Sequence, residues 1–164
     1  MKTVILLRHG KSDWDASFSS DAQRPLAPRG VDAAATMGRF VTAADRAPDL
    51  VVTSPAVRAA TTAQLAHEAG GWTCTIDVDA RLYGASANEA ILTLTELPPS
   101  VDTVLLVGHQ PTWGQLVVLM IGGGWVRFPT AAVACVDFGA TDWSAVGPGR
   151  GELQFLIPPR ALST

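Results

Sequence analysis

The chain contains three short, predominantly apolar runs, which constrain its fold more than any other feature of the sequence. They occupy residues 3–7, 50–53 and 101–107, and none alternates regularly between polar and apolar side chains. A strand without such alternation is typical of a parallel sheet that helices cover on both faces. Each run precedes, directly or after a polar segment, residues with helical spacing of apolar side chains. The sequence therefore predicts repeated strand–helix units.

Further helices and strands complete the predicted pattern. Helices are expected over residues 30–46, 54–69, 87–97 and 111–121, and further strands over residues 74–78, 131–138 and 152–157. No helix separates the last two strands, which a glycine-rich turn over residues 147–151 connects. Residues 1–164 are thus expected to form one three-layer α/β/α domain, with a mostly parallel sheet and an antiparallel C-terminal hairpin.

Composition excludes several classes of function. The net charge is −3 and there is no basic stripe, which argues against a nucleic-acid partner. The apolar runs fall far short of the ~20 residues that span a bilayer, and the run after Lys2 ends at Arg8, unlike a signal peptide. We therefore expect a cytoplasmic protein without membrane contact. Cys74 and Cys135 match no metal or redox spacing and are expected to be buried thiols in strands.

Polar side chains follow the predicted strands at one edge of the sheet. In open parallel sheets, ligands bind beyond the carboxyl ends of the strands. The residues found just after the first, second and fourth strands are Arg8, His9 and Gly10, then Ser54 and Arg58, then His109 and Gln110. Two histidines and two arginines are therefore expected to converge on one rim.

This combination suits the transfer of a phosphoryl group. Guanidinium groups offer planar pairs of N–H donors to phosphate oxygens, and helix N-termini add further N–H groups. A neutral imidazole is a competent nucleophile near neutral pH, and Gly10 lets the backbone approach the bound group. Each residue also has a structural interpretation: Arg58 as a solvated helix residue, His9 as a hydrogen-bonded loop residue, His67 as a favourable charge at a helix C-terminus. For Arg58 and His9, the joint placement of the site residues at equivalent strand ends favours a functional role.

At these residues the sequence resembles the histidine phosphatase superfamily, also called phosphoglycerate-mutase-like. The matching motifs are Leu7-Arg-His-Gly10, Ser54-Pro-x-x-Arg58-Ala59 with Thr62-Ala63, and Val107-Gly-His109-x-Pro111. Within the superfamily the chain looks most like the small SixA-type phosphohistidine phosphatases. That branch is also suggested by Arg24-Pro-Leu26 with Gly30 and by Phe128-Pro-Thr130.

The resemblance implies a role for each site residue. His9 would be the catalytic nucleophile that becomes phosphorylated, with one ring nitrogen facing phosphorus and the other donating to a carbonyl. Arg8 and Arg58 would bind the phosphoryl oxygens, with Gly10 and Gln110 in the same phosphate-binding set, and His109 would be the second catalytic histidine of the phosphate pocket. No metal and no cofactor is implied, because the arginines supply the positive charge.

The chain departs from many members of the superfamily in its proton donor. Those members carry an acidic residue after the third strand, whereas residues 81–86 contain no carboxylate. Asp13, Asp79 and Glu89 are the candidate donors. An alkoxide leaving group needs protonation far more than an imidazole or a phenolate. The missing acid therefore points towards P–N or activated P–O bonds.

The sequence thus predicts a metal-independent phosphatase that acts on phosphohistidine in a protein. The alternatives are a small-molecule or general phosphomonoesterase of the same fold and a non-catalytic phosphate-binding module. A mutase is disfavoured because residues 80–100 leave room for one helix and no lid. A scaffold that associates through residues 117–125 is a further alternative, although burial of this segment in the core is favoured. The substrate, partner protein and oligomeric state are left open.

Overall fold

The structure is a computed structural model that describes residues 1–163. Its centre is a six-stranded sheet in the order β3-β2-β4-β1-β5-β6. The strands are β1 (Lys2–Arg8), β2 (Leu50–Thr53), β3 (Ile76–Val78), β4 (Thr103–Gly108), β5 (Val133–Phe138) and β6 (Gly151–Ile157). The first four strands pair in parallel, whereas β5 runs antiparallel to β1 and forms an antiparallel hairpin with β6. The predicted fold class is confirmed.

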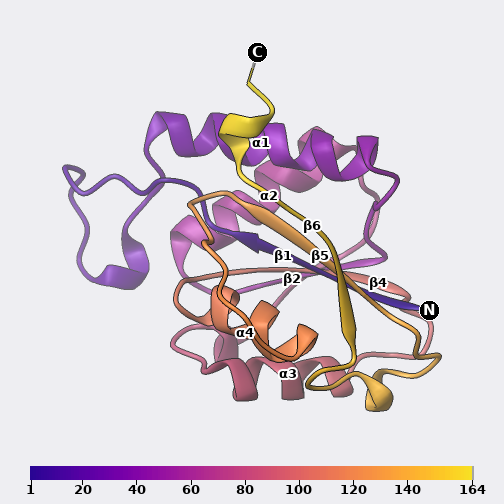
Figure 1. Ribbon diagram of the computed structural model, residues 1–164. Coiled ribbons are helices and arrows are strands. Elements are labelled where there is room, and N and C mark those ends of the chain that lie inside the picture. Colours follow the sequence, from indigo (N-terminus) through magenta and orange to yellow (C-terminus); the bar gives the residue numbers. More distant parts are fainter. Residues whose placement is uncertain (164) are drawn as a thin grey trace.

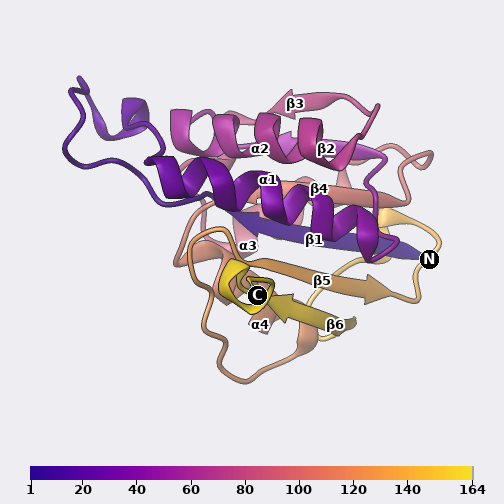
Figure 2. The same ribbon diagram turned by 90° about the horizontal axis from the view of Figure 1, so that it is seen from above.

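Helices cover both faces of this sheet (Figures 1 and 2). Helices α1 (Pro28–Ala43) and α2 (Val57–Gly70) lie on one face, and α3 (Ala87–Thr95) and α4 (Thr112–Ile121) lie on the other. Alternate residues of β1 enter two separate cores: Val4 and Leu6 pack on the α3–α4 side, and Ile5 and Leu7 pack on the α1–α2 side. Because both faces are buried, β1 has no polar alternation.

Three local predictions from the sequence need correction. The third strand is shorter than expected and begins at Ile76; it is an edge strand, and its Val78 is exposed. Cys74 consequently lies outside any strand and is only partly buried, whereas Cys135 is buried in β5 as predicted. Helix α2 begins at Val57, three residues after Ser54, which instead accepts a hydrogen bond from the backbone N–H of Ala56 at 3.3 Å.

Two close contacts fix the loops at the carboxyl edge of the sheet. The Nε1–H of Trp113, in the first turn of α4, donates to the backbone carbonyl of Leu7 at 3.0 Å. Gly10, just after β1, approaches Gly30 so closely that an added Cβ would lie 2.6 Å from the Gly30 carbonyl oxygen. Glycine is therefore required at position 10, because any Cβ would collide with backbone that cannot move independently.

The long loop between β1 and α1 has local structure of its own. It contains a 3₁₀ turn (Asp21–Gln23), and a backbone bridge between Ser12 and Leu26 closes its base. In Figures 1 and 2 this loop extends away from the sheet beside α2. Its base therefore lies against the carboxyl ends of the strands, where the predicted site residues are found.

Candidate active site

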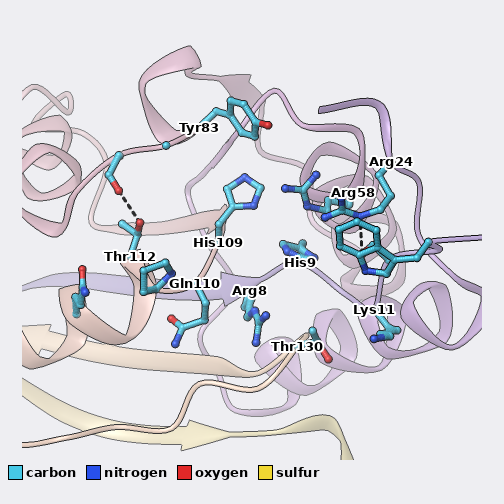
Figure 3. Close-up of a pocket in the computed structure, with 16 residues that line it drawn as sticks. Arg8, His9, Lys11, Arg24, Arg58, Tyr83, His109, Gln110, Thr112 and Thr130 are labelled. Atoms are coloured by element: carbon cyan, nitrogen blue, oxygen red, sulfur yellow. Dashed lines mark hydrogen bonds between the residues drawn. The ribbon is translucent and has the colours of Figure 1, made fainter. Parts of the chain in front are cut away.

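A cavity of about 710 Å³ lies at the carboxyl edge of the sheet (Figure 3). Its lining includes all four residues singled out from the sequence: Arg8, His9, Arg58 and His109. They come from the end of β1, the first turn of α2 and the turn after β4. The parallel arrangement of β1, β2 and β4 brings these strand ends to one edge, as the topology rule predicts.

The imidazole of His9 is held in one orientation. Its Nδ1 lies 2.7 Å from the backbone carbonyl oxygen of Gly10, and its side chain and backbone together are 8% exposed. The backbone of His9 is fixed as well, because its N–H donates to Gly108 at 3.0 Å and its carbonyl accepts from Ala131 at 3.0 Å. A carbonyl oxygen can only accept, so Nδ1 carries the hydrogen and Nε2 keeps its lone pair.

The second histidine lies beside the first. The ring centroids of His9 and His109 are 5.2 Å apart, and the ring of Tyr83 meets that of His109 edge-on at 5.6 Å. His109 Nε2 lies 2.8 Å from the hydroxyl oxygen of Ser54. The rings of His9 and Tyr83 and the hydroxyl of Ser54 therefore fix the position of His109 between β2 and the turn after β3.

Burial and positive charge keep both histidines neutral. Burial lowers the pKa of His9 to about 3, and the charges of His109, Arg58 and Arg8 act in the same direction. Burial lowers the pKa of His109 to about 4, with a further contribution from Arg58. At neutral pH, His9 is therefore an unprotonated imidazole with an available lone pair.

The two arginines are anchored through part of their guanidinium groups. Arg8 Nη1 donates to the backbone carbonyl of Phe128 at 2.9 Å. Arg58 donates through Nη1 to the backbone carbonyl of Asp21 at 2.7 Å and through Nη2 to its carboxylate at 3.0 Å. These bonds hold the guanidinium groups in place and leave the Nε–H groups without a protein partner.

Unpartnered buried nitrogens are concentrated in this one cavity. Within residues 1–163, the buried side-chain nitrogen and oxygen atoms that lack a hydrogen-bond partner are Arg8 Nε, Arg58 Nε and His109 Nδ1. Buried polar groups are normally hydrogen-bonded, and leaving one unpaired costs about 1–3 kcal/mol. Three such atoms on residues that line the same cavity indicate a site built for a ligand with several acceptor oxygens.

The sequence did not identify Asp21, whose carboxylate connects Arg58 to Arg24. The carboxylate of Asp21 accepts from Arg58 and Arg24 and from the hydroxyl of Tyr83 at 2.7 Å. Asp21 lies in a loop where no periodicity marks it, and only its position three residues before Arg24 could have suggested the ion pair. Arg24 also stacks on the exposed ring of Trp14, with its Cζ 3.7 Å from the ring centroid.

The three candidate proton donors lie outside the cavity lining. Asp13 accepts from the backbone N–H of Asp15 at 3.0 Å, within the loop. Asp79 pairs with Arg81 at 2.8 Å, and Glu89 closes the capping box at the start of α3. Each carboxylate already has a local structural partner.

The remaining predicted residues have distinct positions. The N–H of Gly10 donates to the hydroxyl of Thr62 at 3.1 Å, which ties the loop after β1 to α2. Gln110 lines the cavity, and its Oε1 accepts from the backbone N–H of Gly114 at 2.6 Å. His67 lies outside the cavity lining and is hydrogen-bonded to the carbonyl of Cys74 at 2.8 Å.

Among residues 1–163, no group of three or more His, Cys, Asp or Glu side chains is arranged to hold a metal ion. None of the helices in the same range is long and apolar enough to cross a membrane. The polar side chains that line the cavity are those of arginine, lysine, histidine, tyrosine, glutamine, serine and threonine residues.

The fold and the cavity together define an α/β phosphatase of the phosphoglycerate-mutase-like type. Residues 4–90 match the model of the histidine phosphatase superfamily, branch 1. An uncharacterized protein of Mycobacterium tuberculosis is 34% identical over 168 residues, which cover 94% of this chain and all of that protein. The chain belongs to the histidine phosphatase superfamily.

Solved structures place the chain near SixA proteins within this superfamily. The protein histidine phosphatase SixA in complex with tungstate is 27% identical, with a TM-score of 0.84 over 98% of this chain and 99% of that one. A candidate phosphohistidine phosphatase SixA from Nakamurella multipartitia is 26% identical, with a TM-score of 0.80 over 96% of both chains. The predicted SixA-like fold is confirmed.

Proposed function

We propose that this phosphatase removes the phosphoryl group from phosphohistidine in a protein, with His9 as nucleophile. The observation that carries the proposal is the fixed tautomer of His9 beside three unpartnered buried nitrogens. One group is ready to attack phosphorus, and the others are ready to bind the oxygens of the phosphoryl group.

The first chemical step transfers the phosphoryl group to His9. The lone pair of His9 Nε2 forms a bond to phosphorus as the bond from phosphorus to the leaving nitrogen breaks, and the leaving imidazole takes up its proton from solvent. Arg8 and Arg58 bind the equatorial oxygens through their free Nε–H groups. The carbonyl of Gly10 stabilises the positive charge that develops on the His9 ring, because it accepts from Nδ1–H.

His109 acts as a neutral hydrogen-bond donor in this proposal. Ser54 accepts from Ala56 N–H, and its own hydroxyl hydrogen is then available to His109 Nε2. The hydrogen of the His109 ring then lies on Nδ1, the nitrogen that has no protein partner. This Nδ1–H donates to a phosphoryl oxygen.

The second step regenerates the enzyme. A water molecule attacks phosphorus, the bond between phosphorus and His9 Nε2 breaks, and inorganic phosphate leaves with the water oxygen. The water hydrogens end on phosphate or in solvent, so His9 returns to its neutral form. The low pKa of His9 favours this step, because the neutral imidazole is the more stable product.

The lining of the cavity supports phosphohistidine over alkyl phosphates. Asp13, Asp79 and Glu89 lie outside it, so no candidate donor from the sequence is placed to protonate an alkoxide. The segment between β3 and β4 contains a 3₁₀ turn and the single helix α3, so it supplies no second helix to cover the cavity. The likeness to SixA proteins supports the same substrate class.

A comparison of three substrates tests the proposal. The purified enzyme would be assayed for phosphate release from a phosphohistidine-containing protein, an aryl phosphate and glycerol phosphate, with His9→Ala as the inactive control. We expect kcat/KM to be highest for the phosphohistidine protein and lowest for glycerol phosphate. Preferential turnover of glycerol phosphate or another small alkyl phosphate would overturn the proposal in favour of a phosphomonoesterase of the same fold.

A further inference from the structure

Two further hollows adjoin the catalytic cavity. The first, of about 540 Å³, shares Lys11 and Thr130 with the cavity, and the second, of about 490 Å³, shares Arg8 and Gln110 with it. Pro129 and Arg160 line both hollows, so the surface continues around the loop before β5. Figure 3 shows the shared residues Arg8, Lys11, Gln110 and Thr130 along one side of the cavity.

Positive charge is concentrated on this surface. We define the basic rim as the cationic residues that line the two hollows: Arg8, Lys11, Arg29, Arg127 and Arg160. Asp32 is the one carboxylate among the described residues that line them. The chain as a whole has 15 acidic and 12 basic residues, so the sign of the charge on the rim is opposite to that of the whole protein.

The cations of the basic rim are not neutralised within the described chain. Within residues 1–163, the cations that form ion pairs lie outside the basic rim: Lys2, Arg24, Arg46, Arg58 and Arg81. Arg29, Arg127 and Arg160 are also exposed. Exposed cations of one sign beside a cleft raise the local concentration of anionic partners and speed their association.

We propose that the basic rim docks an acidic surface of the substrate protein next to its phosphohistidine. This proposal rests on the function proposed above and names the chemistry of the partner. An enzyme with a net charge of −3 repels an acidic protein at long range, and a local basic surface at the mouth of the cavity reverses that repulsion where binding occurs.

The basic rim extends over a wide surface, which favours a protein rather than a second small anion as its binding partner. Its cations line two hollows on either side of residues 128–130, rather than converging on one point. Trp125, two residues before Arg127, is fully exposed. Exposed tryptophan and arginine are the residue types that contribute most to protein–protein interfaces.

Charge reversal tests the rim without touching the catalytic cavity. The double variant Arg127→Glu/Arg160→Glu changes two cations outside the cavity lining, and Arg39→Glu/Arg150→Glu is the control with the same change in net charge. Arg39 and Arg150 are exposed and line neither hollow of the rim. The substrates are phosphohistidine peptides with acidic or with neutral flanks, and an aryl phosphate.

The rim variant should discriminate between these substrates. We expect KM for the acidic peptide to rise about tenfold, whereas kcat/KM for the neutral peptide and the aryl phosphate changes by less than about twofold. Added salt should raise KM of the unmodified enzyme for the acidic peptide alone. An equal loss with all substrates, no loss, or the same loss in the control variant would each overturn the docking proposal.

A binding measurement separates this proposal from the one on which it rests. Fluorescence anisotropy would follow an acidic peptide that carries a non-hydrolysable phosphohistidine analogue, so that docking is measured without turnover. We expect the rim variant, and not the control, to bind it about tenfold more weakly. Unchanged binding contradicts docking, whereas turnover of aryl phosphate without turnover of phosphohistidine contradicts the proposed substrate alone.

Discussion

Asp21 holds Arg58 through two acceptors, its backbone carbonyl at 2.7 Å and its carboxylate at 3.0 Å. The same carboxylate oxygen accepts from the hydroxyl of Tyr83, in the turn after β3, at 2.7 Å. The loop after β1 is thereby tied to α2 and to the turn after β3. Asp21 therefore positions a predicted phosphate-binding arginine rather than facing the substrate itself.

Asp21→Ala should lower kcat/KM for an aryl phosphate by about tenfold, because charge-assisted hydrogen bonds are worth about 1.5–3 kcal/mol. The hydrogen bond from Tyr83 and the nearby Arg24 and Arg58 keep the pKa of Asp21 well below its usual range. Asp21 is thus ionised across the working pH range and is a poor proton donor.

The shape of the pH profile distinguishes positioning from proton donation by Asp21. We expect the profile of Asp21→Ala to keep its shape while its height falls. The exposed Asp15→Ala, in the same loop, is the matched control and should retain full activity. A profile that loses one limb in Asp21→Ala would show that this carboxylate carries a proton.

The leaving group should control the rate strongly. With Asp13, Asp79 and Glu89 outside the cavity lining, protonation assists departure little, so kcat/KM for a series of aryl phosphates should fall as the pKa of the phenol rises. Asp13→Ala, Asp79→Ala and Glu89→Ala should each leave this dependence unchanged. Selective loss of activity towards alkyl phosphates in one of them would identify a general acid.

The activity should tolerate mild acid. The folded-state pKa values of His9 and His109 are about 3 and about 4, below the ordinary value of 6.5. Corrected for ionisation of the substrate, kcat/KM should therefore stay level between about pH 5 and pH 8. A tenfold fall with an apparent pKa near about 6.5 would show that the nucleophile is protonated in the free enzyme.

The same shifts predict how stability depends on pH. Because the folded-state pKa values are lowered, the unfolded chain binds more protons between about pH 6.5 and pH 3. The free energy of unfolding should fall as the pH decreases through this window. His109→Asn, which has no titrating ring, should show a shallower fall in urea titrations at a series of pH values.

Much of the fold could be predicted because burial leaves a direct mark on the sequence. β1, β2 and β4 are central strands, so their runs are apolar throughout, and the predicted position of β2 is the observed one. β3 was predicted too long because it is an edge strand, where pairing on one side and solvent on the other weaken the pattern. Topology predicted that Arg8, His9, Arg58 and His109 share one edge of the sheet, and the family resemblance supplied their roles.

The residues that support the site could not be found in the same way. Asp21 and Tyr83 contact each other and Arg58 or His109 through loop conformations that long-range contacts determine. The approach of Gly10 to Gly30 is such a contact, and the local sequence around either glycine does not predict it. Loop geometry depends on these tertiary contacts, whereas strands and helices follow periodicity.

Gly10→Ala should destabilise the protein and remove its activity together. The added methyl group would lie 2.6 Å from the Gly30 carbonyl oxygen, and overpacking of this kind costs about 1–3 kcal/mol. Gly139→Ala is the matched control, because a Cβ there meets nothing within 4 Å. Thermal unfolding should show a lower Tm for Gly10→Ala only, and an unchanged Tm would place the loop elsewhere.

The central claim is that His9 becomes phosphorylated, and mass spectrometry of the trapped intermediate tests it most directly. The enzyme would be mixed with a phosphoryl donor, quenched in alkali, which preserves phosphohistidine, and digested. We predict one phosphoryl group on the peptide with His9, none on the peptide with His109, and none in a folded His9→Ala protein. A phosphoryl group on His109, or full turnover by His9→Ala, would contradict the account.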